Sequence, residues 1–525
     1  MNQLSAVDEQ VWGREFNQLD VFARNISMDY LALGVDLLIG VLMLPFNMAH
    51  LGASTYGLWV LVASVTAYFS MLDLGYGVAQ VKFASEYRAR RDSEGLNQIV
   101  SSLFFVFCII GVLAFATGVF LAFNLTKFFN ITPSQAETGR EVMLIISAYV
   151  ALGFPASVFG GIVNGFQRHY LNGSISIPTS IVVATVNVVV ILAGYGLVAL
   201  VAATTTIRAL SHIGYAVNAY RAYPGLRIRL SNIRLVRLRE VTGFSCFILL
   251  IDLANKINYS TDAIVIGAFL GTVSIAIWTV AQRLIDATQI VTGQLNGAMF
   301  PIIVDTATLG QSDRLRRLFI QGTRISLAMV VPIATGLSLL AEPLVRAWVG
   351  PDFAEAVPVI YVLAIVVVIR VGNSTATTLL KGGGQHRLLA NSNLLIAFVN
   401  LVISIALVRV MGLMGVALGT LIALAGVSIF VLFPAACRRV ELSIGEALRS
   451  AIFPSLWPLV VMAAFLAISR SLASANLVAI AAQALTAGLL YLAVFLTLAI
   501  DSKERQWYIT KFKELLKRAS AIATA

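Results

Sequence analysis

The sequence predicts an all-α polytopic membrane protein of about 14 transmembrane helices. Most of these helices form two parallel six-helix repeats, expected to make N- and C-lobes around a central cavity, and two further helices follow at the C-terminus. Hydrophobic residues make up 58% of the 525 positions and charged residues only 12%, a balance that soluble proteins of this size do not show. The apolar runs are roughly 18 to 25 residues long, as a spanning helix requires, and the two halves of the chain resemble each other.

Apolar segments follow one another along the whole chain, and we predict a membrane-spanning helix for each. Helices are expected because lipid offers no hydrogen-bond partner to backbone N–H and C=O groups. The first 26 residues carry four acidic side chains and no apolar core, so no cleavable signal peptide is expected and the first span directs insertion. The predicted spans are 28–48, 57–80, 100–124, 141–163, 172–193, 196–219, 243–269, 273–300, 323–341, 355–379, 388–408, 412–435, 452–469 and 476–500.

The distribution of basic residues predicts the orientation. An even number of spans places both termini on one side, and 28 of the 37 Lys and Arg residues fall on that side, against five on the opposite side. Because Lys and Arg accumulate in cytoplasmic loops, both termini are expected in the cytoplasm. The net charge of +11 follows from this bias and from attraction to anionic lipid headgroups, so no nucleic-acid partner is expected.

An internal repeat relates the two halves of the chain. The segment LGASTYGLW begins at Leu51 and LGTVSIAIW begins at Leu270, an offset of 219 residues. Six spans per repeat is an even number, so the halves have the same orientation and an axis along the membrane normal relates them. Transporters place their substrate between such repeats. The other matched pairs are Ser93 and Ser312, Leu96 and Leu315, Gly165 and Gly383, Gln167 and Gln385, Asn187 and Asn400, and Gly196 and Gly415.

The repeat and the charge runs divide the chain into six parts. The basic tail after Asp501 places Tyr508, Phe512 and Leu516 on one helical face, which is typical of an interfacial helix. The predicted parts are an N-terminal cytoplasmic segment (1–27), the N-lobe (28–222), a cytoplasmic linker (223–241), the C-lobe (242–436), spans 13 and 14 (450–500) and the cytoplasmic tail (501–525).

Charged side chains within the predicted spans are the candidate functional residues. An ionised group at mid-bilayer costs roughly 2.5 to 3.5 kcal/mol even on permissive scales, so each must face a wet cavity or a partner. Those near the middle of a span are Asp36, Arg208, Asp252, Lys256, Arg283, Asp286 and Arg370, and those nearer the ends are Asp73, His212 and Asp262.

Two pairs among these residues have alternative interpretations. Asp252 and Lys256 are four residues apart and Arg283 and Asp286 three apart, so each pair shares a helix face and can neutralise itself. The four side chains then form either a packing network between adjacent spans or part of a polar cavity.

Arg208 and Arg370 have no acidic neighbour at helical spacing, and Asp36 stands alone near the middle of the first span. Arg208 and Arg370 are expected to line a cavity and meet an anion. Asp36 is either a charge partner for one of these arginines or a carboxylate that couples transport to a cation. His212 is predicted to pack between helices.

The sequence contains no constellation typical of an enzyme. It has no nucleotide-binding loop and no HExxH motif, and its four histidines are scattered. Cys108, Cys246 and Cys437 are too far apart in sequence to suggest a metal site or a disulfide framework. We therefore expect no catalytic residues, no metal and no cofactor. A polymerase or ligase acting on lipid-linked sugar is disfavoured because the longest extracytoplasmic loop, residues 124–140, is short.

One long segment resembles a known family. The sequence LGASTYGLWVLVASVTAYFSMLDLGYGVAQVKFASEYRARRD, from Leu51 to Asp92, is similar to the opening signature of bacterial polysaccharide repeat-unit flippases of the Wzx type. These belong to the MOP superfamily together with MATE drug exporters and the lipid II flippase. Residues 262–278, Phe300-Pro301, residues 348–350 (WVG) and the two GxQ motifs also resemble the family, so the similarity covers spans 1–12.

The resemblance implies export across the bacterial inner membrane. Its substrate is expected to be an undecaprenyl-pyrophosphate-linked oligosaccharide repeat unit, flipped by alternating access of two lobes for surface or exopolysaccharide assembly. A polysaccharide polymerase and other assembly proteins are expected partners, together with the lipid bilayer.

A pyrophosphate requires cations in the cavity, which gives the charged residues candidate roles. Arg208, Lys256, Arg283 and Arg370 are assigned to substrate binding on their charge and depth rather than on a motif. Asp73 lies in the LDLG element of the family signature, where it is either a gate residue or a structural one. The candidate ion-coupling groups or charge partners are Asp36, Asp252 and Asp286.

Three other functions remain as alternatives. A MATE-like antiporter for cationic compounds requires acidic rather than basic cavity residues, and four buried basic residues disfavour it. A lipid II flippase has the same fold, although the signature resembles the polysaccharide branch more closely. A non-transporting scaffold for a glycan assembly complex does not explain charges in the spans of both halves.

Overall fold

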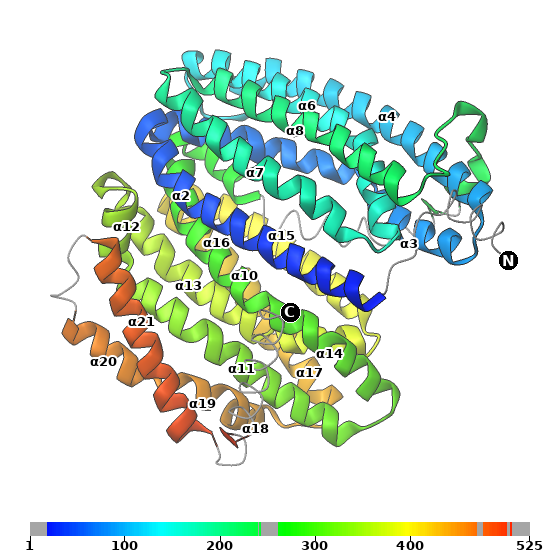
Figure 1. Ribbon diagram of the computed structural model, residues 1–525. Helices are drawn as coiled ribbons and strands as arrows, with labels where there is room; N and C mark the ends of the chain where they lie inside the picture. Colours follow the sequence, from blue (N-terminus) through cyan, green and yellow to red (C-terminus); the bar gives the residue numbers. More distant parts are fainter. Residues whose placement is uncertain (1–17, 240, 243–260, 470–475, 501–504, 507–525) are drawn as a thin grey trace. The chain divides into compact units, whose positions relative to one another are not determined.

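The computed structural model describes residues 18–239, 241–242, 261–469, 476–500 and 505–506 (Figure 1). Within these ranges every regular element is a helix, which confirms the predicted all-α membrane fold. Eleven helices in this part of the chain are long and apolar enough to cross a membrane. The exact count of 14 stays a prediction. One helical segment, Ser27–Asp73, contains the first predicted span and most of the second, and the helix at the eighth, Thr272–Thr308, is not among the eleven. Much of the seventh predicted span falls on residues 243–260, outside the described ranges.

The chain forms two compact units, Met1–Ala276 and Ile277–Ala525. The lobe boundaries expected from the repeat remain predictions. The first unit contains α2 (Gln18–Ala67), η1 (Tyr68–Asp73), α3 (Tyr76–Ala89), α4 (Ser93–Phe123), α5 (Leu125–Phe128), α6 (Pro133–Gly165), α7 (His169–Leu192), α8 (Leu197–Ala222) and η2 (Leu230–Asn232).

The helix α10 (Thr272–Thr308) begins at the end of the first unit and continues into the second. The second unit then contains α11 (Ser312–Leu339), α12 (Ala341–Trp348), η3 (Pro351–Phe353), α13 (Ala356–Gly372), α14 (Ser374–Gly382), α15 (His386–Met411), α16 (Leu413–Val427), η4 (Ser428–Leu432), α17 (Phe433–Arg439), α18 (Ile444–Ala447), η5 (Leu448–Ile452), α19 (Phe453–Leu456), α20 (Leu459–Ser469), α21 (Leu477–Val494) and η7 (Phe495–Ala499).

The backbone itself repeats between the two halves. Gly52 and Gly271, which the sequence pairs, both have positive φ angles, 78° and 89°. Gly52 breaks α2 into two helical segments, so this 50-residue element contains the first predicted span and the start of the second. The second predicted span, 57–80, continues through η1 into α3. Ser93 and Ser312 begin α4 and α11 at the same offset of 219 residues. Conformations at matched positions therefore support the predicted duplication.

Close helix contact in the first unit depends on small residues. The helices α4, α6 and α8 lie side by side (Figure 1). A Cβ atom added at Gly111 of α4 would lie 2.4 Å from the carbonyl oxygen of Ala151 on α6. A Cβ atom added at Gly118, seven residues further along α4, would lie 2.0 Å from Ser147 Oγ. Small residues let helix backbones approach closely where lipid provides no hydrophobic driving force.

In the second unit, an arginine fixes the last spans to α11. Pro454 has no N–H, so the carbonyl of Ser450 four residues earlier loses its usual helical donor. The Arg324 guanidinium replaces it, donating to Ser450 O from Nε at 2.9 Å and from a terminal nitrogen at 2.5 Å. In return, the Ser455 hydroxyl donates to the carbonyl oxygen of Arg324 at 3.0 Å. The predicted span 323–341 begins beside Arg324, whereas α11 begins at Ser312, three turns earlier.

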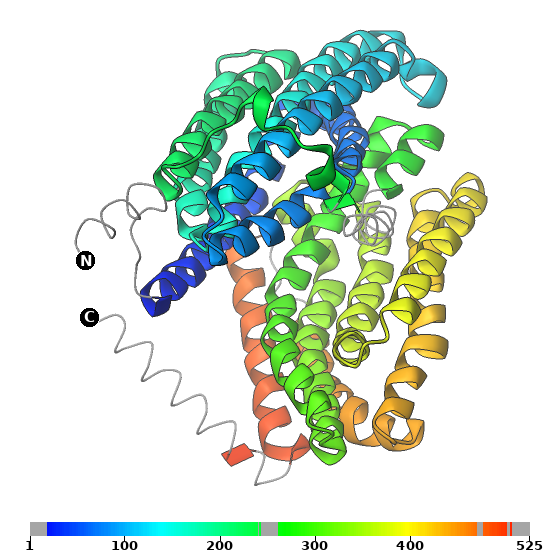
Figure 2. The same ribbon diagram turned by 90° about the vertical axis from the view of Figure 1, so that its right-hand side faces the viewer.

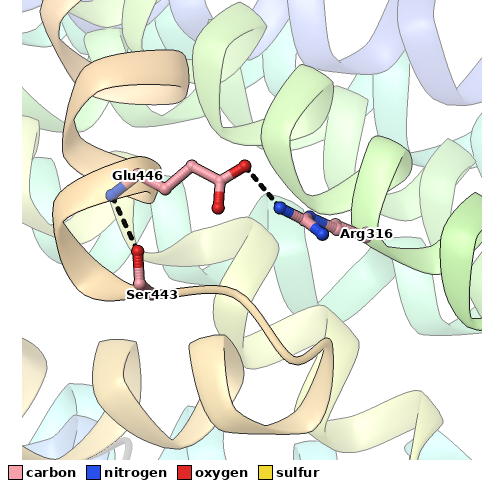
Figure 3. A network of polar contacts seen from close by, with 3 residues as sticks. All are labelled: Arg316, Ser443 and Glu446. Atoms are coloured by element: carbon pink, nitrogen blue, oxygen red, sulfur yellow. Dashed lines mark hydrogen bonds and ion pairs between the residues drawn. The ribbon is translucent and has the colours of Figure 1, made fainter.

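Two further contacts extend this junction (Figures 1–3). Arg316 of α11 forms an ion pair with Glu446 of α18, and Ser443 caps α18 by accepting the Glu446 N–H at 3.2 Å (Figure 3). The Tyr491 hydroxyl of α21 donates to Ser455 O at 2.7 Å. The helices α20 and α21 consequently pack beside α11.

The close contact at Gly111 gives a test of this packing. We expect Gly111→Ala to lower the free energy of unfolding by about 1 to 3 kcal/mol, because the added methyl group meets a backbone oxygen that cannot rotate away. Gly488→Ala is the matched control, since a methyl group added at this glycine of α21 has no atom within 4 Å. The control should leave stability unchanged or raise it through better helix propensity. The melting temperatures of the two purified variants in detergent are compared, and equal shifts would contradict the packing account.

Candidate functional site

The structure describes six of the eight predicted site residues. Asp252 and Lys256 lie outside the described ranges, so their pairing and their roles stay predictions. The others lie on α2 (Asp36), at the end of η1 (Asp73), on α8 (Arg208), on α10 (Arg283 and Asp286) and on α13 (Arg370).

A cluster of charged side chains in the second unit contains residues of α10 and α13. Asp286 Oδ1 accepts a hydrogen bond from Gln282 Nε2 at 2.7 Å. Arg283, on the same helix, and Arg370, on α13, both interact electrostatically with this carboxylate. Among the residues that the structure describes, the cluster therefore contains two guanidinium groups and one carboxylate.

This arrangement changes the interpretation of the Arg283 and Asp286 pair. In the part of the chain that the structure describes, Arg283 makes no direct ion pair, and its side chain is exposed. The direct partner of Asp286 is Gln282, a residue that the sequence interpretation did not name. The spacing of four residues between Gln282 and Asp286 is the sequence signal that indicates this bond. The electrostatic contact with Arg370 comes from another helix and has no such signal.

A second candidate cluster lies in the first unit, on one face of α8. Arg208, His212 and Tyr215 are spaced by four and three residues, so they lie along the same face. The His212 ring stacks on Tyr149 of α6, with centroids 6.0 Å apart and an interplanar angle of 10°, and it lies 6.3 Å from Tyr215. These contacts agree with the packing role predicted for His212.

Arg208 stands one turn along this face, beside the packed rings. Its side chain is exposed and makes no ion pair with any residue that the structure describes. Asp36 of α2 is also exposed and has no ion-pair partner in the described ranges. Both charges are thus open to a ligand or to solvent within this unit.

Asp73 has a clear structural contact. Leu74 and Gly75 have φ angles of 55° and 79°, which end the 3-10 helix η1 and reorient the chain. One carboxylate oxygen of Asp73 accepts the backbone N–H of Gly77 in the first turn of α3, at 3.3 Å. A negative charge at a helix N-terminus also interacts favourably with the helix dipole. The geometry supports the structural interpretation of the LDLG element.

Comparisons with known proteins agree on one family and one fold. A family model described as "Polysaccharide biosynthesis protein" matches residues 22–307. The uncharacterized membrane protein EpsK of Bacillus subtilis is 20% identical over 392 residues, which cover 74% of this chain and 77% of that protein. The succinoglycan biosynthesis transport protein ExoT of Rhizobium meliloti is 31% identical over 160 residues, covering 30% of this chain and 31% of that protein.

Solved structures of two transporter types share the fold. The lipid II flippase MurJ in an inward closed conformation has a TM-score of 0.67 at 15% identity and covers 90% of this chain and 98% of its own. An inward-facing multidrug resistance transporter of the MATE family, in the MOP superfamily, has a TM-score of 0.66 at 15% identity, covering 80% and 98%. The predicted fold class is confirmed, while the fold alone does not distinguish flippases from drug exporters.

The two interpretations of Asp73 predict different outcomes for one substitution. Asp73→Asn keeps an oxygen that accepts the Gly77 N–H, so a structural Asp73 predicts near-normal export and protein level. Asp73→Ala removes the acceptor and should lower the free energy of unfolding by about 1 kcal/mol. Glycan export and membrane protein level are measured together. Lost export by Asp73→Asn at a normal protein level would show instead that the charge itself acts in transport.

Proposed function

Because the chain belongs to the family of polysaccharide biosynthesis proteins, we propose that it translocates polyprenyl-pyrophosphate-linked oligosaccharide repeat units across a bacterial inner membrane. The membrane fold supports transport, and the names of ExoT and of the teichuronic acid biosynthesis protein TuaB of Bacillus subtilis associate such relatives with polysaccharide transport or synthesis. Translocation leaves every covalent bond of the substrate intact, so the proposal requires no catalytic residue. Alternating access of the two repeat halves is the expected mechanism.

The two arginines near Asp286 are the observation that carries this proposal. A pyrophosphate head brings at least two negative charges into a region where water is scarce, and guanidinium groups bind phosphate oxygens through two parallel hydrogen bonds. Arg283 and Arg370 supply two such groups against one carboxylate in the second unit. Arg208 supplies another in the first unit, where it has no ion-pair partner in the described residues. Lys256 remains part of the proposed set from its sequence position alone.

The same charges disfavour the main alternative. An exporter of cationic compounds needs carboxylates that remain available to its substrate. In the second unit, however, the Asp286 carboxylate already accepts the Gln282 amide and lies near two arginines. A lipid II flippase would use the same cationic chemistry, because its substrate is also linked through a pyrophosphate. Family membership favours polysaccharide repeat units over that substrate.

Substitution of the arginines tests substrate binding. Arg208→Ala and Arg370→Ala should each reduce export roughly tenfold or more, because a charge-assisted hydrogen bond contributes about 1 to 3 kcal/mol. Export is measured as surface or secreted polysaccharide in a host that depends on this chain, with membrane protein level as the reference. Arg314→Ala removes an exposed arginine at the start of α11 and should leave export unchanged. Wild-type export by both test variants would refute the binding assignment.

Neutralising Asp286 distinguishes anionic from cationic substrates. Asp286→Asn keeps an oxygen that accepts the Gln282 amide but removes the negative charge beside two arginines. We expect the purified variant to bind a polyprenyl pyrophosphate severalfold more tightly, because charges in a partly wet site interact appreciably. If the chain instead exported cationic compounds, Asp286→Asn should weaken the binding of its substrate. Asp313→Asn, at an exposed position in the first turn of α11, is the control for a general change in charge.

A further inference from the structure

The segment after α8 is fastened to α4 along its length. Asn97 of α4 accepts the Arg227 N–H at 2.6 Å and donates its amide to Gly225 O at 3.0 Å and to the Tyr223 hydroxyl at 3.2 Å. Burial raises the pKa of Tyr223 to about 12, so its hydroxyl stays neutral at physiological pH. Residues 223–239, which we call the linker segment, therefore begin as a docked part of the first unit (Figures 1 and 2).

Two buried serines of α4 also form hydrogen bonds with the linker segment. Ser101 Oγ donates to Arg227 O and accepts the Arg229 N–H, both at 3.2 Å. Ser102 Oγ, one residue along, accepts the Arg234 N–H at 3.0 Å. Leu226, Ile228 and Leu238 of the linker segment pack against the apolar core of the first unit. One face of the segment is consequently fixed by both hydrogen bonds and burial.

The opposite face is apolar and basic. Leu230, Leu235 and Val236 have 70%, 79% and 71% of their surface exposed, which is unusual for large aliphatic side chains in a polar loop. Arginines lie between them, and residues 223–239 contain no acidic residue. Exposed apolar side chains interleaved with arginines are typical of elements that lie in a membrane interface. The exposed arginines are Arg227, Arg229, Arg234 and Arg239.

The length of α4 places this face at the level of the lipid headgroups. Its 31 residues span about 46 Å, whereas the hydrocarbon core is about 30 Å thick. An upright α4 therefore has roughly ten residues outside the core. The predicted span, 100–124, leaves the N-terminal residues 93–99 of α4 outside it. The linker segment bonds to Asn97, Ser101 and Ser102, within the first ten residues of α4, on the side that the arginine distribution predicts to be cytoplasmic.

We propose that the linker segment is a lipid-binding element, which inserts Leu230, Leu235 and Val236 among the acyl chains of the cytoplasmic leaflet. Arg229, Arg234 and Arg239 bind the headgroups of anionic phospholipids beside them. The hydrogen bonds to α4 hold the segment in place before lipid binds, so little ordering of the backbone opposes the interaction. An acidic protein partner would account for the arginines but leaves the three exposed aliphatic side chains without an apolar environment.

Lipid selectivity tests the arginines. The full-length protein is reconstituted in phosphatidylcholine, and EPR spectra give the association of spin-labelled phosphatidylglycerol relative to labelled phosphatidylcholine. The variant R229Q/R234Q/R239Q should lose about twofold or more of this selectivity, because each basic residue near an anionic surface contributes appreciably. R314Q/R317Q/R387Q removes the same charge from exposed positions elsewhere and should keep it. Unchanged selectivity in the first variant, or an equal loss in the second, would overturn the proposal.

Membrane depth tests the aliphatic side chains. A nitroxide label is attached at position 235 through Leu235→Cys, in a full-length variant whose three native cysteines are replaced by alanine. In phosphatidylglycerol vesicles the label should be more accessible to oxygen than to a water-soluble nickel complex, which indicates insertion. Greater accessibility to the nickel complex would place Leu235 in water and overturn the proposal. A patch that binds an acidic protein gives this second result, together with unchanged lipid selectivity.

Discussion

Backbone hydrogen bonding in lipid is the constraint on which this structure depends. A free carbonyl in hydrocarbon has no water to bind, so wherever a helix loses an internal bond, a side chain must supply it. Arg324 does this for Ser450, whose helical donor is missing because Pro454 has no N–H. Outside the predicted spans, Asn25 fixes a loop, donating to Gln167 O at 2.7 Å and accepting the Tyr170 N–H at 2.9 Å. These polar residues maintain the fold and are not available to a substrate.

This constraint separates structural polar residues from functional candidates. Asp73 accepts a backbone N–H of α3, and Arg324 holds the Ser450 carbonyl, so each has a structural contact that accounts for its position. Arg208 and Arg283 serve no backbone group through their guanidinium groups in the described part of the chain. Arg208 stands on a helix long and apolar enough to cross a membrane, and Arg283 lies in the eighth predicted span. A cation at such a depth is costly unless an anion or water meets it. Their position is most simply explained by a ligand that brings negative charge.

Hydropathy and repetition predicted most of the fold, because both are local properties of the sequence. Gly52 and Gly271 could be paired from the amino-acid sequence alone, and both have the left-handed backbone that glycine permits. The candidate site was less predictable. Asp286 and Arg370 interact electrostatically, but they are far apart in the sequence and stand on different helices. The prediction missed the first three turns of α11, because these turns are polar and the apolar run starts later. The docking of the linker segment depends on serines and an asparagine of α4, which have no periodic signal.

The composition of the Asp286 cluster gives a reason why the proposed site for an anionic substrate contains a carboxylate. Two guanidinium groups without any counter-charge would be unfavourable whenever the site is empty, and they would hold a pyrophosphate too tightly for release. One carboxylate reduces the repulsion between the arginines in the empty site and also weakens their hold on pyrophosphate. The hydrogen bond from Gln282 fixes the orientation of this carboxylate without adding charge. In the proposed site, the two arginines then still attract a dianionic head, and the carboxylate stabilises them between transport cycles. A transporter must bind its substrate on one side and release it on the other, so a partly compensated cationic site suits that cycle better than a fully exposed one.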